Sequence, residues 1–174
     1  MSLDLDGGLI WLDFHVHAGA QIRASYYNFT NNQSIWDEEL EIIRHYAIPI
    51  GQTVLGQSIQ VFQINKDLFG FSLYFELPQE INKINAVSLM WVSSKNFNPF
   101  QILNSLKSIL SSFDALNPII NNEVLQQISD NIIQNKGNMN ITLLDNNNQE
   151  IRLTSHVNPN LNNEPVENLL KNNS

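Results

Sequence analysis

Residues 86–93 read AVSLMWVS, and this stretch decides the fold class. Its apolar side chains follow one another almost without interruption, which is typical of a central strand whose sheet is covered on both faces. A strand of that kind needs other elements to cover both faces of its sheet. The runs and turn signals on either side of it predict where the remaining elements lie.

Two further predicted strands lead into this central strand. Residues 58–65 and 68–77 are rich in apolar and aromatic side chains, and Lys66-Asp67 between them forms a turn. We expect a loop at residues 78–85 before the central strand begins. Three consecutive strands joined in this way predict an antiparallel meander.

The start of the chain predicts a β-hairpin followed by a helix. Apolar and polar residues alternate over residues 10–17, which is the period of a strand with one buried face. Gly19 supports a turn before a second strand at residues 21–27, because glycine adopts positive φ without strain. Residues 34–46 predict a helix with Ser34 at its N-cap, since acidic residues fill its first turn and apolar residues recur at helical spacing.

The second half of the chain predicts two helices and a small hairpin. Asn98-Pro99 marks the start of a helix that Pro118 ends, and a further helix covers residues 122–135. Residues 139–144 and 150–153 form the expected hairpin. The element order is therefore β-β-α-β-β-β-α-α with an added hairpin. It predicts the α+β class, with a five-stranded, mostly antiparallel sheet and helices on both faces.

Composition indicates one ordinary domain and excludes several functions. We assign residues 1–153 to a single domain and residues 154–174, which hold seven Asn, to a flexible tail. A net charge of −8 argues against binding to nucleic acid or anionic lipid. The absence of Cys excludes a disulfide scaffold and a Cys-ligated zinc site. No apolar run suits a transmembrane segment or a signal peptide, so we expect a cytoplasmic protein.

The order and lengths of these elements resemble a longin domain. Three stretches resemble in particular the longin-like N-terminal domains of nitrogen permease regulator-like and DENN-type proteins. They are FHVHAGAQI at residues 14–22, FSLYF at residues 71–75, and LMWVSSKNFNPF at residues 89–100, where a strand enters a helix. The resemblance covers residues 8–135 and departs from the family at His17 and Ala20, where Gly-Pro-type hairpins are commoner.

This resemblance implies a non-enzymatic domain without a cofactor. Longin-like domains act in vesicle trafficking, in complexes that regulate small GTPases, and in nutrient-signalling assemblies. They pair with another longin or roadblock domain through the first helix and an exposed strand edge. The implied partner is therefore such a domain, a small GTPase, or a second copy of this chain in a homodimer. Such partners would bring the protein to the surface of endomembranes.

The predicted first helix carries more apolar residues than one contact with a sheet needs. A single contact takes an arc of about 100°, and the surplus includes Trp36, Ile42 and Tyr46. Trp and Tyr commonly anchor protein interfaces. Ile59 and Val61 share one face of the strand at residues 58–65, which has no Lys or Pro to protect a free edge. We predict that these five residues bind a partner, although contact with the segment after the helix would also explain the surplus.

A second pattern points to a different class of function. Asp13, His15 and His17 alternate along one strand and so share a face, where carboxylate and imidazole suit a metal ion such as zinc. A similar string opens the metal-dependent amidohydrolases, whose barrel of about 250 residues is too long for this chain. The face is therefore either a metal- or small-ligand-binding surface or an ordinary polar strand face. No nucleophile elbow, phosphate loop or carboxylate pair assigns a catalytic residue.

Overall fold

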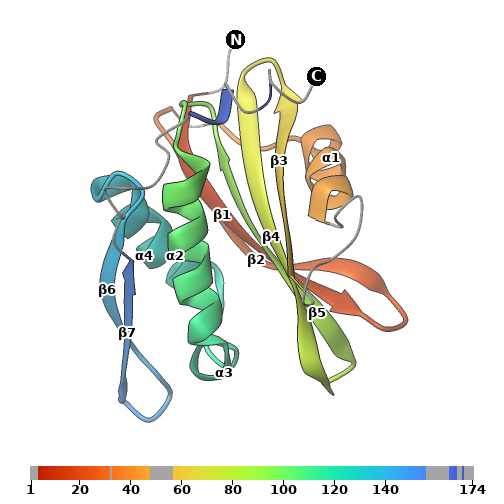
Figure 1. The fold of residues 1–174 in the computed structure, drawn as a ribbon, viewed down its shortest axis with the longest axis vertical. Coiled ribbons are helices and arrows are strands. Elements are labelled where there is room, and N and C mark those ends of the chain that lie inside the picture. The colour runs from red at the N-terminus through yellow and green to blue at the C-terminus, as the bar shows by residue number, and fades with distance from the viewer. Residues whose placement is uncertain (1–3, 32, 48–56, 156–164, 168–169, 171–174) are drawn as a thin grey trace.

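The computed structural model describes residues 4–31, 33–47, 57–155, 165–167 and 170. Within them, one sheet has the strand order β2-β1-β5-β4-β3, and every neighbouring pair is antiparallel (Figure 1). Its strands are β1 (Leu5–His15), β2 (Gly19–Phe29), β3 (Gln57–Asn65), β4 (Leu68–Ile81) and β5 (Ile84–Ser93). The predicted five-stranded antiparallel sheet is confirmed.

The stretch AVSLMWVS lies in β5, the central strand of this sheet. β5 pairs with β1 along one edge and with β4 along the other. Residues 86–93 are all buried. The near-continuous apolar run is therefore confirmed as a strand covered on both faces.

Helix α1 (Asp37–Ala47) covers one face of the sheet, where it contacts β3, β4 and β5 (Figure 1). Ile43 and Ala47, on the side of α1 that faces the sheet, are fully buried. Tyr46 stacks on Phe62 of β3, with ring centroids 4.5 Å apart and the planes 9° from parallel. The Phe62 ring also lies over Gly70 of β4, at a place where a Cβ atom would come within 2.2 Å of it.

The opposite face carries α2 (Pro99–Ser111), the one-turn α3 (Phe113–Leu116) and α4 (Asn122–Gln134). The side chains of Asn98 and Asn121 cap α2 and α4, because each accepts a hydrogen bond from a backbone N–H of the first turn. These helices cover the larger apolar cluster, in which Trp11 of β1 stacks on Phe113 at 5.8 Å. Helices on both faces of the sheet, as predicted, are confirmed.

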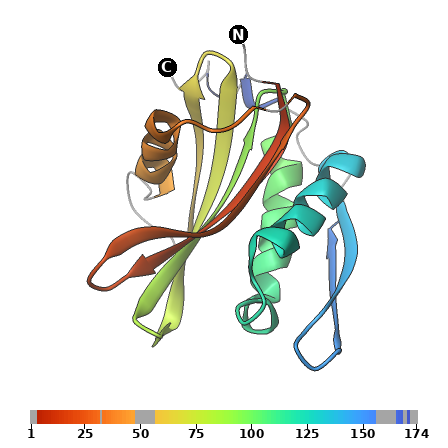
Figure 2. The ribbon, with the colours of Figure 1, turned by 180° about the vertical axis from the view of Figure 1, so that it is seen from behind.

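The C-terminal hairpin forms an additional outer layer. β6 (Met139–Leu144) and β7 (Glu150–Ser155) pack on α4 and α2, on the side away from the sheet (Figure 2). Their inward side chains join the larger apolar cluster. The side-chain amide of Asn131 in α4 pairs with the backbone of Asn140, donating to its oxygen at 3.0 Å and accepting from its nitrogen at 2.8 Å. This amide occupies the outer edge of β6 as a neighbouring strand would.

The predicted loop at residues 78–85 is wrong, because both strands continue through it. β4 runs to Ile81 and β5 begins at Ile84, so only Asn82 and Lys83 lie in the turn. Both have positive φ, 52° and 67°, which suits a two-residue hairpin turn. The β4-β5 hairpin therefore extends well beyond the core of the sheet.

Other element boundaries also differ from the sequence prediction. β1 begins at Leu5 and ends at His15, whereas alternation predicted residues 10–17. Its early part contains Gly7, where a Cβ atom would lie 2.3 Å from the Trp91 ring, so close packing explains a glycine within a strand. α1 begins at Asp37, and Ser34 therefore does not cap it.

The chain after the hairpin returns to the domain at one described point. β7 ends at Ser155, beyond the predicted domain limit at residue 153. Val166, within the predicted tail, is fully buried, and its N–H donates to the Phe97 oxygen at 2.8 Å. Most of the predicted tail lies outside the described residues. None of the described helices is long and apolar enough to cross a membrane.

Candidate functional site

The structure places the predicted helix residues in different surroundings. Trp36 precedes the first turn of α1 and is 68% exposed, and Ile42 on the outer side of the helix is also exposed. Tyr46 instead packs on Phe62 and belongs to the smaller apolar cluster. The exposed part of the predicted surface is therefore Trp36 and Ile42, while Tyr46 holds α1 on the sheet.

A single carboxylate fixes Trp36 beside the end of β3. Glu39 Oε1 accepts the Trp36 backbone N–H at 3.2 Å, and Glu39 Oε2 accepts the Asn65 side-chain N–H at 2.9 Å. The Trp36 oxygen accepts the Leu40 N–H at 3.0 Å, the first hydrogen bond of the helix. These bonds hold the backbone of the exposed Trp36 close to the end of β3.

Part of the apolar surplus of α1 lines a groove instead of standing free. A cavity of about 420 Å³ lies between the helix and β2. Ile35 and Leu40 line it from the helix side, and Tyr27 and Phe29 line it from the strand side. Burial of the Tyr27 phenol raises its pKa to about 12. The groove extends the apolar surface of α1 toward β2.

β3 is an edge strand without a single charged residue. Its sequence is QSIQVFQIN, and within the part of the chain that the structure describes it pairs with β4 alone. Ile59 is 52% exposed, whereas Val61 is half-buried against the larger cluster. Phe62 packs on the α1 side, so the alternation of the strand puts Ile59 and Val61 on the opposite face. The predicted residues thus flank the β3 edge from both faces of the sheet.

The other edge of the sheet, β2, is covered. The Ser25 backbone N–H donates to the Asn122 side chain at 2.9 Å. Arg23 donates to both the side-chain and backbone oxygens of Asn117, and α4 packs along the strand. No comparable hydrogen bond is made to the outer backbone of β3 within the described residues. β3 is accordingly the edge at which an additional strand could pair.

The alternative face of Asp13, His15 and His17 is only partly formed. Asp13 is 5% exposed, and His15 is half-buried on the same side of β1. His17 is exposed in the turn after β1, so the prediction that it continues the strand face is wrong. Among the residues that the structure describes, no group of three His, Asp or Glu side chains could hold a metal ion. The metal-binding alternative is not supported.

Burial dominates the electrostatics of Asp13. Its Oδ1 accepts the Trp11 indole N–H at 2.9 Å, and its Oδ2 lies 3.9 Å from Arg23 Nη1. Desolvation raises the pKa of Asp13, against the smaller lowering effects of Trp11 and Arg23. Sequence reasoning did not single out Arg23, although it is the only charged residue in β2.

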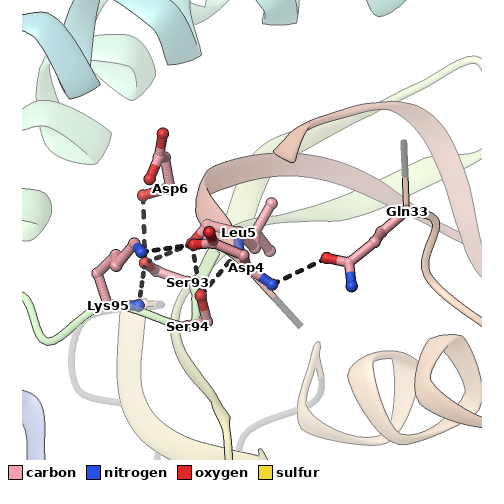
Figure 3. Close-up of polar contacts among 7 residues, drawn as sticks. All are labelled: Asp4, Leu5, Asp6, Gln33, Ser93, Ser94 and Lys95. Atoms are coloured by element: carbon pink, nitrogen blue, oxygen red, sulfur yellow. Dashed lines mark hydrogen bonds and ion pairs between the residues drawn. The ribbon is translucent and has the colours of Figure 1, made fainter. Parts of the chain in front are cut away.

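A polar cluster at the junction between β5 and α2 fastens the start of β1 (Figure 3). Ser93 Oγ donates to the Leu5 oxygen, and Ser94 Oγ accepts the Leu5 N–H at 2.7 Å. Lys95 Nζ pairs with Asp4, which lowers the pKa of Asp4 and raises that of Lys95. The predicted strand-to-helix junction at Ser93-Ser94 is confirmed.

Comparison with known proteins assigns no family to this chain. No protein-family model matches the chain, and no curated protein sequence matches it significantly. Among solved structures, it is similar to the Lst4 longin domain of K. lactis, with a TM-score of 0.33 and 12% identity over 74% of each chain. Similarity at this level assigns no corresponding residues. The longin-like description rests on the chain's own element order and sheet order, with helices on both faces.

Proposed function

We propose that this chain is a non-enzymatic protein–protein interaction domain of the longin-like type. It assembles with itself or with a longin or roadblock partner, in small-GTPase regulation or vesicle trafficking. In this proposal it works in the cytoplasm and reaches endomembranes through its partners. The longin resemblance of residues 8–135 supports the class of function.

The observation that carries the proposal is the edge strand β3, which has no charged residue, pairs with β4 along one side, and lies beside the exposed Trp36. Soluble proteins protect free edges with Lys, Pro or a covering element, because unpaired N–H and C=O groups recruit other strands. β3 contains neither Lys nor Pro over its whole length. An added partner strand would satisfy its outer backbone groups, and the alternate side chains would give specificity.

Three side chains would supply the apolar contacts of such an interface. Ile59 stands on one face of the edge strand, and Trp36 and Ile42 stand on the α1 face. A large aromatic anchor with aliphatic neighbours is the composition of an interface core. Tyr46 contributes indirectly, because its stacking on Phe62 holds α1 in place.

The test compares Ile59→Lys with Leu144→Lys. Leu144 is a matched control, because it is 58% exposed on β6, in the outer hairpin, whereas Ile59 is 52% exposed at the proposed edge. Light scattering across a concentration series measures self-assembly against the monomer mass of 19.9 kDa. Titration with purified longin and roadblock domains measures assembly with a partner.

We expect assembly of the unmodified chain to survive Leu144→Lys and to weaken at least tenfold with Ile59→Lys, which corresponds to about 1.4 kcal/mol. A lysine at the edge leaves an unpaired charge where the partner strand would lie. Equal effects of the two substitutions would reject β3 as the interface. A chain that stays monomeric and binds none of these domains would reject the proposed function itself.

A further inference from the structure

A cavity of about 410 Å³ lies on the sheet face opposite α1. β1 and β2 supply Asp13 and Arg23 to its wall, and the extended β4-β5 hairpin supplies Leu77 and Ile84. Phe113 of α3 closes it from the helix side. α3 and the end of the β4-β5 hairpin lie at the same end of the molecule (Figures 1 and 2). The cavity has the size and the mixed apolar and polar lining of a small-molecule site.

The polar centre of this cavity is the carboxylate of Asp13, of which one oxygen accepts no hydrogen bond from the described residues. Asp13 Oδ1 accepts the Trp11 indole N–H at 2.9 Å. Asp13 Oδ2 receives no hydrogen bond from the described residues, and its nearest cationic atom, Arg23 Nη1, is 3.9 Å away. That separation is too long for a hydrogen bond. Asp13 Oδ2 keeps some contact with solvent, so it is free to accept a hydrogen bond from a molecule bound in the cavity.

Arg23 is held away from this oxygen by other contacts. Its two terminal nitrogens donate to the side-chain and backbone oxygens of Asn117. Its guanidinium carbon lies 5.9 Å from the centroid of the Trp11 ring, over the indole. Arg23 therefore lowers the local negative charge without serving as the hydrogen-bond donor that Asp13 lacks.

From this arrangement we propose that the cavity binds a small organic cation with a primary ammonium head and an apolar body. The ammonium donates to Asp13 Oδ2, and the body lies against Phe113, Ile84 and Leu77. A charge-assisted hydrogen bond is about twice as strong as a neutral one, so an ammonium suits Oδ2 better than a hydroxyl does. An anionic head would meet the Asp13 carboxylate at low solvent exposure and is disfavoured.

The test uses 2-phenylethylammonium as the probe, with 2-phenylethanol and 3-phenylpropanoate as neutral and anionic counterparts. Calorimetry measures each dissociation constant, and ¹H–¹⁵N spectra follow the indole N–H signals. The Trp11 indole reports on the site directly, because its N–H donates to Asp13. Trp36 and Trp91 do not line this cavity and are internal controls.

We expect saturable binding of the ammonium compound, with a shift of the Trp11 indole signal alone. The alcohol should bind at least about tenfold more weakly, and the carboxylate should not bind. No saturable shift of the Trp11 signal, or equal affinity for the amine and the alcohol, would overturn the proposal. Neither result bears on the β3 edge, so the tests of this site and of the proposed function are independent.

Three substitutions locate the binding. Asp13→Asn should weaken the ammonium compound by at least about tenfold, because the amide is uncharged. Ile81→Trp should abolish binding by filling the cavity from the β4 side without altering the carboxylate. Asp67→Asn, a matched loss of one carboxylate in the turn between β3 and β4, outside this cavity, should leave the affinity unchanged. Equal affinity of Asp13→Asn and Asp67→Asn, or full binding by folded Ile81→Trp, would reject the site.

Discussion

Gly70→Ala should strongly destabilise the domain, because Gly70 lies directly under the Phe62 ring. A Cβ atom at Gly70 would lie 2.2, 2.3 and 2.8 Å from three carbon atoms of that ring, against an ordinary contact of 3.4–4 Å. The ring must therefore withdraw by at least about 1 Å. It is 2% exposed and stacked on Tyr46 at 4.5 Å, so it has little room to move.

The expected loss follows from these contacts. Overpacking of a core costs about 1–3 kcal/mol, and disruption of an aromatic pair adds about 0.5–1.5 kcal/mol. Replacement of glycine by alanine in a strand raises the free energy of unfolding by up to about 1 kcal/mol, because alanine loses less backbone entropy on folding. The free energy of unfolding should therefore fall by about 0.5–4.5 kcal/mol, against the roughly 5–15 kcal/mol that typical domains have.

A double-mutant cycle with Phe62→Leu distinguishes a clash with the Phe62 ring from destabilisation of β4 by any side chain at position 70. Urea unfolding followed by circular dichroism gives the four free energies. In the Phe62→Leu background, Gly70→Ala should lower the stability by less than about 0.5 kcal/mol or raise it by up to about 1 kcal/mol, because no ring atoms remain to clash. An equal loss in both backgrounds, or no loss in the unmodified chain, would refute the reasoning.

Two further substitutions test the core and its charge. Ser105→Ala should lower the free energy of unfolding by about 1–3 kcal/mol in urea melts, because the buried Ser105 Oγ contacts the Gly137 oxygen at 2.6 Å and Ser155 Oγ at 2.7 Å; unchanged stability would mean that water replaces the hydroxyl. Burial raises the folded-state pKa of Asp13 above its ordinary value of 3.8, so the folded chain holds the carboxyl proton more tightly than the unfolded chain does. The ionisation of Asp13 therefore lowers the free energy of unfolding as the pH rises from the unfolded-state pKa through the folded-state pKa. Asp13→Asn should remove this loss, so the stability of the variant relative to the unmodified chain should rise with pH in melts from about pH 3 to 7; a difference independent of pH would contradict the assignment.

The fold was predictable because its main signals are local. Residues 86–93 indicate a strand covered on both faces through their apolar run, and the alternation from Ile10 to His15 gives the buried side of β1. Asn98-Pro99 marks a helix start through capping chemistry alone. The order of these signals also predicted the antiparallel sheet and the helices on both faces.

The extended β4-β5 hairpin was missed because its sequence resembles a loop. Pro78, Gln79 and Glu80 have low strand propensity, and the turn at Asn82 and Lys83 contains no glycine. Pairing with β5 resumes only at Ile81, after a register shift that begins at Glu76. Tertiary pairing, which the sequence does not display locally, overrides the loop signal.

The candidate sites were predictable in part. An excess of apolar residues on one helix indicated an exposed surface, and Trp36 and Ile59 are exposed at the β3 edge. Alternation did not show that Tyr46 is used to hold the helix, because its partner Phe62 lies on a separate strand. The cavity beside Asp13 depends on Arg23 and Asn117, which are 94 residues apart, and no local pattern reports such a contact.

The position of β1 has a consequence for how the protein folds as it is synthesised. β1 is made before the central strand β5 and lies next to it, and the Leu5 oxygen accepts a hydrogen bond from Ser93, 88 residues later. At translation rates of about 5–20 residues per second, about 4–18 s pass between the synthesis of Leu5 and that of Ser93. During this interval the apolar faces of β1 have no sheet to join, which gives the nascent chain a period of exposure to chaperones.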